Sequence, residues 1–376
     1  MTGRALLPAV VALLAALGCA TAPPAVPVGP DPREAYPIYD FTPPPGDVRR
    51  LPADFEPLTE LLLGFPEEGF PHTAFFAELI AAAAPEVAGV VVHVPSAAAR
   101  ARLTNALLAR RVDVGRVRFA EVPLDTMWIR DYGPLLVETS DGGRRVVDLR
   151  YSYGRWQDDA FPTRLARSWG LPVSRPPLAA DGGNLLSDGT GRCITTERVL
   201  LQNRRRSYTR RQIRDLLRSY LGCRETAILP TLVGEGTGHA DLFAAVTGPG
   251  RVLVGRYDPV DDPVNAAVLD QAANLLADAG FAVTRIPMPG HEGLVFRTYT
   301  NALIVGGAVL VPVYADDRRF EREALETLRQ AWPGKRVVPI DATGIIRRFG
   351  GLHCVGLTAA RPGSSSGGRA APTPPR

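Results

Sequence analysis

Lysine is almost absent from this 376-residue chain, and histidine and cysteine are scarce. Lys335 is the single lysine, so arginine supplies nearly all of the positive charge behind the formal net charge of +4. The densest basic run, residues 204–206, has only Tyr208 as a neighbouring aromatic residue, and sites for single-stranded nucleic acid combine basic with stacking aromatic residues. We therefore expect a solvated basic surface there and no nucleic-acid partner.

The apolar run at the amino terminus, residues 5–17, is too short for a transmembrane helix of about 20 residues. Arg4 precedes it and small residues lead to Cys19, which is typical of a secretory signal over residues 1–18. Because a cysteine directly follows the cleavage point, the segment resembles a bacterial lipoprotein signal. It predicts a lipid anchor on Cys19 and a location in the bacterial cell envelope, on a periplasmic or outer-membrane face. Plain secretion and a chance apolar start are the alternatives.

Two low-complexity segments bracket the rest of the chain. Residues 19–50 contain many prolines and little periodicity, which predicts an extended tether. Residues 361–376 are rich in Gly, Ser, Pro and Ala, which predicts a disordered tail. No proline-rich linker interrupts residues 51–360, so we expect one domain there.

Apolar strand-like runs alternate with helical patterns in this domain, which indicates the α/β class. Strands are predicted at 89–94, 118–122, 145–149, 252–257 and 308–314, and helices at 73–84, 97–111, 209–221, 265–279 and 318–332. Divided into five units, the domain gives roughly 60 residues to each, a size that a ββαβ module can fill. The residues themselves do not repeat, so symmetry does not follow from the sequence alone.

Cys354 is the candidate nucleophile. If Cys19 carries lipid, Cys193 and Cys223 can pair, which leaves Cys354 as the free thiol. It follows Gly350-Gly351 and precedes the apolar run 355–357, so we expect it at the mouth of a short buried strand. A thiol becomes a nucleophile only where other groups lower its pKa or remove its proton. The alternative is that Cys354 is merely a small buried hydrophobic residue.

Three polar motifs can supply those groups. The first, DTMWIRDYGP, contains Trp128, Arg130 and Asp131, and can also be a turn with a surface salt bridge. The second, EGTGHADLF, places His239 and Asp241 two residues apart, so on a strand they would share one face as a base with a cation-binding carboxylate, or as two metal ligands. The third begins DGGN, contains Asn184, and read alone is more often a hairpin.

A free cysteine, a histidine and two aspartates suit one reaction in particular. A guanidinium is a planar cation with paired N–H donors, which carboxylates such as Asp131 and Asp241 can hold by bidentate hydrogen bonds. Cys354 would attack the guanidinium carbon, and His239 would protonate the departing ammonia and then activate water to hydrolyse the covalent thiouronium. This chemistry needs no metal or organic cofactor.

The order Trp-x-Arg-Asp-x-Gly-Pro, Gly-Gly-Asn, Gly-His-x-Asp and Gly-Gly-x-His-Cys resembles the agmatine deiminase and Porphyromonas-type peptidylarginine deiminase family. The opening LPADFEP, residues 51–57, is also similar to the start of that family. The resemblance implies a pentein fold, a five-bladed pseudo-symmetric α/β propeller. It also implies Cys354 as nucleophile, His239 as acid/base, and Asp131 and Asp241 as guanidinium clamps, and we expect Trp128, Arg130 and Asn184 to contact the substrate.

The chain departs from the agmatine deiminase pattern at Phe65, Thr237, Leu242 and Leu352. We expect these residues to lie beside the pocket and to change how the tail of the substrate is held. Together with the predicted export, they favour arginine in peptides slightly over agmatine.

Three other functions remain open at this point. An amidinotransferase of the same superfamily would pass the amidino group to an amine and release no ammonia. A non-catalytic envelope lipoprotein would only bind guanidines. A zinc hydrolase would use His239, Asp241, His353 and Cys354 as ligands, although their spacing is unlike familiar zinc sites.

Overall fold

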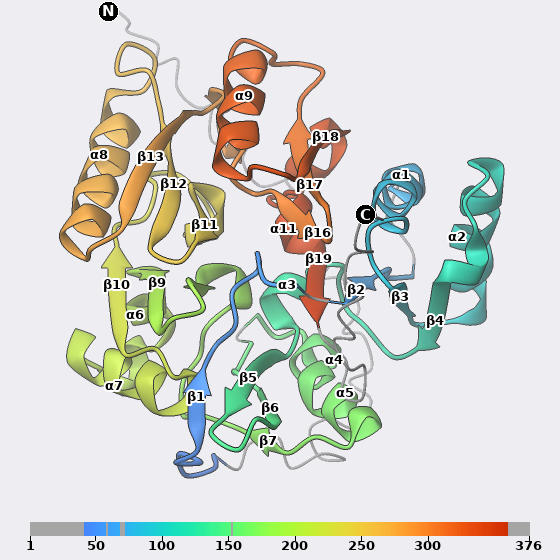
Figure 1. The fold of residues 1–376 in the computed structure, drawn as a ribbon, viewed down its shortest axis with the longest axis horizontal. Helices are drawn as coiled ribbons and strands as arrows, with labels where there is room; N and C mark the ends of the chain where they lie inside the picture. The colour runs from blue at the N-terminus through green and yellow to red at the C-terminus, as the bar shows by residue number, and fades with distance from the viewer. Residues whose placement is uncertain (1–40, 58, 68–71, 152, 360–376) are drawn as a thin grey trace, which may run out of the picture.

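The computed structural model describes residues 41–57, 59–67, 72–151 and 153–359 (Figure 1). The predicted signal peptide, the lipidation site Cys19, most of the predicted tether and the predicted tail lie outside these ranges. Among the described residues, no helix combines the length and apolar character needed to span a membrane.

The described residues form a mixed α/β structure with five sheets of three or four strands and one two-stranded ribbon. One four-stranded sheet contains, in spatial order, β19 (Gly356–Ala359), β2 (Glu60–Gly64), β3 (Gly89–Val94) and β4 (Val117–Glu121). A second four-stranded sheet contains β1 (Val48–Arg50), β5 (Leu135–Thr139), β6 (Arg144–Val147) and β7 (Val173–Ser174). The other three sheets are β10 (Glu225–Leu229), β9 (Arg192–Thr196) and β8 (Leu186–Ser187), then β11 (Ala244–Gly248), β12 (Arg251–Arg256) and β13 (Ala282–Pro287), then β16 (Leu303–Val305), β17 (Ala308–Val313) and β18 (Arg336–Asp341). The ribbon pairs β14 (His291–Glu292) with β15 (Val295–Phe296).

Each sheet contains an antiparallel pair followed by a parallel pair. Because parallel neighbours need a crossover, helices connect them. The longer helices are α1 (Thr73–Ala83), α2 (Ala97–Ala109), α5 (Phe161–Trp169), α7 (Arg210–Leu221), α8 (Pro263–Asp278) and α9 (Glu321–Ala331). Shorter helices are α4 (Trp156–Asp159), α6 (Arg198–Gln202), α10 (Thr343–Ile346), η1 (Val114–Arg116) and η3 (Arg204–Arg206).

Local sequence explains where the crossover helices begin and end. Thr209 and Gln212 form a capping box at the start of α7, and Gly222 ends the helix in the left-handed conformation with φ of 70°. The Asp262 side chain caps α8, whose first residue is Pro263. These signals lie within three residues of the predicted boundaries.

The predicted strands and helices all occur. Cys354 lies at the mouth of the buried strand β19, as expected, on the short helix α11 (Leu352–Val355) that ends directly before the strand begins at Gly356. Two other local expectations were wrong. Val48–Arg50 pairs with β5 as strand β1, although the tether was expected to continue to residue 50. His239 caps the 3₁₀ turn η4 (Ala240–Leu242), so His239 and Asp241 do not share the face of a strand.

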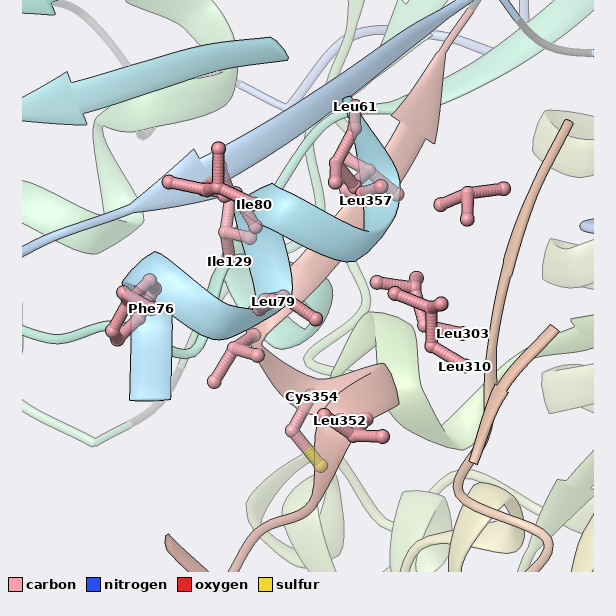
Figure 2. Close-up of a cluster of buried hydrophobic side chains, with 14 of the residues drawn as sticks. Leu61, Phe76, Leu79, Ile80, Ile129, Leu303, Leu310, Leu352, Cys354 and Leu357 are labelled. Atoms are coloured by element: carbon pink, nitrogen blue, oxygen red, sulfur yellow. The ribbon is translucent and has the colours of Figure 1, made fainter. Parts of the chain in front are cut away.

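Cys354 lies at the border of the largest apolar core, which packs α1 against two sheets. Figure 2 shows the thiol at the edge of a cluster of leucines and isoleucines, with the sulfur directed away from Leu79 and Ile80. Leu352 on the same turn is fully buried and anchors α11 to this cluster. Burial of one such side chain contributes about 2 kcal/mol, so the backbone that carries the thiol is held by the core.

Cys193 and Cys223 form a disulfide, a pairing that the sequence allowed. Cys193 lies on β9, and Cys223 lies two residues before the parallel neighbour β10. The bond therefore closes the crossover that contains α6, η3 and α7. Among the described residues, Cys354 is the free cysteine.

Candidate active site

Four short helical turns bring the four sequence motifs together. They are α3 (Ile129–Tyr132), η2 (Gly182–Asn184), η4 and α11. The turn α3 contacts both α11 and η2, and η2 contacts η4. In Figure 1, α3 and α11 lie near the middle of the view with sheets on several sides. Residues from distant parts of the chain therefore meet at one place.

Gly183 marks the point where the catalytic candidates converge. A methyl group on its Cα would lie 2.5 Å from Asp131 Oδ1, 3.0 Å from Asp241 Oδ2 and 3.1 Å from His239 Nδ1. Neighbouring Gly182 lies against the backbone carbonyl of Arg130, where a side chain would also collide. The glycines of the third motif thus allow the backbone to approach the site closely.

His239 lies between two aspartates. Its Nε2 is 2.9 Å from Asp181 Oδ2, and its Nδ1 is 3.5 Å from Asp131 Oδ1. Tyr153 and Gln202 also donate hydrogen bonds to Asp181 Oδ2, at 2.9 Å and 2.8 Å. Burial lowers the pKa of His239, but the carboxylates of Asp131 and Asp181 outweigh this effect and raise it to about 10. His239 therefore carries a proton at neutral pH and can act as an acid.

His353 forms a second bridge between aspartates. Its Nδ1 is 2.7 Å from Asp241 Oδ2, and its Nε2 is 3.1 Å from Asp54 Oδ2. Arg130 Nη2 donates to Asp54 Oδ1 at 2.9 Å. Burial and the charge of Arg130 lower the pKa of His353, but the bonds to Asp241 and Asp54 prevail and raise it.

The Cys354 thiol is buried and contacts one polar side chain, Asn301. Asn301 Nδ2 lies 3.5 Å from the sulfur, and Asn301 Oδ1 accepts a hydrogen bond of 3.0 Å from the His353 backbone N–H. Burial raises the pKa of the thiol well above its usual value, and the negative charges of Asp241 and Asp131 raise it further. Before substrate binds, the thiol is therefore protonated.

Asp131 and Asp241 each have one buried oxygen that accepts no hydrogen bond from the described residues. Among the described residues, Oδ1 of Asp131 and Oδ1 of Asp241 find no hydrogen-bond donor. Burial raises the pKa of Asp131 to about 7, with Asp181 and Asp241 adding to the effect and His239 opposing it. A buried acceptor without a donor is costly, so this pair of oxygens suits a cation that brings N–H groups.

The structure thus brings together Cys354, His239, Asp131 and Asp241 as expected, but it gives other contacts to three predicted substrate-binding residues. Arg130 pairs with Asp54. Asn184 Oδ1 accepts from the Ala240 backbone N–H at 3.0 Å and so holds η4. The Trp128 ring packs against Gly350, where any side chain would collide with it.

Several residues of the site were missing from the sequence-based set. Asp181 opens the DGGN motif and Asp54 lies in the LPADFEP opening, so both stood inside segments already singled out. His353 had been considered only as a zinc ligand. Asn301 lies in Thr300-Asn301, where nothing in the local sequence indicates a contact to a residue 53 positions away.

In the part of the chain that the structure describes, no group of three or more His, Cys, Asp or Glu side chains has the arrangement of a metal site. The imidazoles of His239 and His353 are instead bonded to aspartates, and the sulfur of Cys354 contacts the side-chain amide of Asn301. The four ligands of the hypothetical zinc hydrolase therefore do not form a coordination shell.

Comparisons with known proteins identify relatives named agmatine deiminases. The agmatine deiminase of Stutzerimonas stutzeri is 30% identical over 286 residues, covering 65% of this chain and 77% of the relative. That of Medicago truncatula is 29% identical over 362 residues, covering 81% and 94%. The structure of a C. jejuni agmatine deiminase with substrate bound shares the fold, with a TM-score of 0.73 at 19% identity over 83% of this chain and 96% of that one.

The sequence model of the Porphyromonas-type peptidyl-arginine deiminases matches residues 50–359, a range that includes all four motifs and both histidine bridges. The chain therefore belongs to the Porphyromonas-type peptidyl-arginine deiminase family.

Proposed function

We propose that this protein hydrolyses a guanidinium group to a ureido group and ammonia through a covalent intermediate on Cys354. The observation that carries the proposal is the convergence of the protonated His239 with the carboxylates Asp131 and Asp241 around Gly183. The buried Cys354 thiol adjoins this group, because Asn301 contacts both its sulfur and the backbone carbonyl of Asp241. The relatives named agmatine deiminases support the same reaction.

Binding of the substrate prepares the thiol. The guanidinium N–H groups donate to the unpartnered oxygens of Asp131 and Asp241, and its positive charge offsets theirs. These two carboxylates are among the causes that keep the pKa of Cys354 high. Their neutralisation therefore lowers the pKa, and the thiol proton leaves for solvent.

The first half of the reaction forms a carbon–sulfur bond. The Cys354 thiolate attacks the guanidinium carbon and gives a neutral tetrahedral adduct. His239 donates its proton to one amino group, the carbon–nitrogen bond breaks, and ammonia departs. A positively charged thiouronium remains on the sulfur, and His239 is left neutral.

The second half breaks that bond. Neutral His239 takes a proton from water, whose oxygen attacks the thiouronium carbon. The adduct collapses, the carbon–sulfur bond breaks and returns its electron pair to Cys354, and the hydroxyl proton is released as the ureido carbonyl forms. Asp181 holds the His239 ring during both proton transfers.

Agmatine and peptidyl-arginine are the proposed substrates. The curated relatives favour agmatine, and the description of the family model adds peptidyl-arginine. Three of the residues that differ from the agmatine deiminase pattern, Phe65, Leu242 and Leu352, are buried, which weakens the preference for peptide substrates that they suggested. Thr237 bonds to Glu235 in its own loop.

The test is an assay for ammonia and ureido product with agmatine, free arginine and arginyl peptides, on wild type and Cys354→Ala. We expect ammonia from at least one guanidine and none from the variant, whose fold should persist because the change removes little volume. Transfer of the amidino group to an added amine, with neither ammonia nor ureido product, would indicate an amidinotransferase. Binding without turnover would indicate a guanidine-binding protein.

We also propose that residues 51–360 are one domain with the pentein fold, in which the five sheets are the blades of a pseudo-symmetric propeller. The repeated order of an antiparallel pair followed by a parallel pair supports this arrangement. A crystal structure in which successive sheets were not related by similar rotations about one axis would contradict it.

Export and lipidation are proposed on the sequence alone. Residues 1–18 would be removed and Cys19 would carry the lipid that anchors the protein in the cell envelope. Labelled palmitate should enter the wild-type protein but not Cys19→Ser, and only the wild type should fractionate with membranes. Label in both proteins, or in neither, would contradict the anchor.

A further inference from the structure

His353 has no task in the reaction described above, yet it lies within the site. Its two ring nitrogens face Oδ2 of Asp241 at 2.7 Å and Oδ2 of Asp54 at 3.1 Å. Ionised carboxylates only accept hydrogen bonds, so both nitrogens must carry hydrogen for both contacts to be favourable. The ring is therefore an imidazolium shared by two aspartates.

We propose that Asp54 and His353 are positioning residues that act as a unit, and that their bridge orients the carboxylate of Asp241 for the guanidinium. The bridge takes up Oδ2 of Asp241, while Oδ1 is buried without a partner among the described residues. One oxygen is thus fixed and the other is left for the substrate. This inference rests on the proposed function.

The groups around His353 favour its charged form on balance. Asp54 and Asp241 bond to it, Asp131 interacts with it through charge, and Arg130 opposes it. Arg130 is itself bonded to Asp54 at 2.9 Å, so its charge is paired with that aspartate. If Asp54 lost its charge, His353 would have one carboxylate fewer beside it and would still face the positive charge of Arg130. Both conditions favour deprotonation of the His353 ring.

A count of charges shows why the bridge matters for binding. The two bridges contain the carboxylates of Asp54, Asp131, Asp181 and Asp241 and the cations Arg130, His239 and His353. With all of them ionised, one negative charge is in excess, which a single guanidinium balances. Without the His353 charge the excess grows by one, and the carboxylates would bind a proton in place of substrate.

The position of Asp54 also allows chemical rescue, in which an added anion replaces the carboxylate that a mutation has removed. It lines a cavity of about 110 Å³ together with Pro52, Arg130 and Leu357, and its side chain is 30% exposed. A water molecule occupies about 30 Å³ in the liquid, so a small anion such as formate fits this cavity. Glu138 lines the same cavity but bonds to Arg50 at 2.8 Å, so it serves as a matched control.

The experiment compares Asp54→Asn, His353→Asn and Glu138→Gln in the full chain. We expect kcat/KM to fall about 100-fold in the first two variants, because a displaced clamp costs roughly that much. The fall should include a raised KM and a shifted pH profile, and Glu138→Gln should behave as wild type. Formate should restore part of the activity of Asp54→Ala in proportion to its concentration and should not stimulate wild type.

A second measurement is independent of turnover. The NMR titration of His353 should show a pKa above the ordinary value of about 6.5 in wild type and a lower one in Asp54→Asn. A folded Asp54→Asn with wild-type kcat/KM, or with an unchanged His353 titration, would overturn the inference. If wild type turned over no guanidine, the proposed function would fail, and the His353 titration alone would decide whether the bridge exists.

Discussion

At the scale of single residues, the proposed acid His239 and the proposed clamp Asp131 have pKa values displaced from their ordinary ranges. Asp131 has a pKa raised to about 7 by burial, so it is charged, and able to hold a guanidinium, only above that pH. Although burial lowers the pKa of His239, its carboxylate neighbours raise it to about 10, so its acidic proton is lost as pH rises through that value. Asp131 thus sets the lower limit of the pH range in which the site is active, and His239 sets the upper limit.

The pH dependence of kcat/KM should therefore be bell-shaped, with an acidic limb near 7 and a basic limb near 10. Initial rates at low substrate concentration, measured over a range that includes both limbs, check this. An acidic limb near the ordinary aspartate pKa, about 4, would show that Asp131 is not the group that limits binding.

His239→Ala and Asp241→Ala should lose activity in different ways. Removal of the acid should lower kcat by about 10² to 10⁴ with a smaller effect on KM. Removal of the clamp should raise KM and lower kcat together, because the guanidinium carbon is no longer held against the sulfur. Steady-state kinetics separate the two patterns, and small, equal effects would mean that the Gly-His-x-Asp motif is structural.

At the scale of elements, the site depends on short turns, and the turn η2 approaches its neighbours closely at Gly182 and Gly183. The Gly183→Ala change places a methyl group 2.5 Å from Asp131 Oδ1, inside the space where clamp and acid meet. We expect kcat/KM to fall about 100-fold as Asp131 is displaced.

Gly236→Ala is the matched control, since it lies in the loop before His239 with no heavy atom within 4 Å of the added methyl group. It should retain wild-type kinetics. Equal kinetics in both alanine variants, each verified as folded, would argue that the turn η2 does not approach the reacting groups.

The elements that the sequence predicted and those that it missed differ in length. Apolar periodicity located strands such as β3 and β17 and helices such as α1 within a few residues. The four catalytic turns are three or four residues long, too short to show a period, so Cys354 and His239 were expected on or beside strands.

The site was predicted to the extent that its residues lie in motifs. Cys354, His239, Asp131 and Asp241 were found in that way, whereas the bond between His353 and Asp54 joins residues 299 positions apart and depends on the tertiary fold. Phe65 and Leu352 stand beside motifs but are fully buried in the core, which the sequence pattern could not distinguish from lining a pocket.

At the scale of the whole molecule, the disulfide between Cys193 and Cys223 closes a crossover with a sequence separation of 30 residues. Replacing both cysteines with alanine should lower the free energy of unfolding by about 2–4 kcal/mol, since the unfolded chain regains the entropy of that loop. Denaturant unfolding with and without a thiol reductant measures this.

The reductant should shift the unfolding midpoint of wild type and leave that of Cys193→Ala/Cys223→Ala in place. The folded double variant should keep its turnover, because Cys354 remains. If the reductant destabilised both proteins equally, the bond would have no part in stability.

The strand that follows Cys354 pairs antiparallel with β2, one of the first strands in the chain, from Gly356 opposite Leu63 to Ala359 opposite Glu60. A ribosome that has made every other part of the site has therefore not yet made the nucleophile, and the sheet that will seat it has an open edge. Nascent chains and products truncated before α11 contain the proposed acid and clamps but neither the thiol nor His353, whose ring bonds to Asp241. They therefore lack the nucleophile of the proposed reaction, and synthesis of α11 is the step that supplies it.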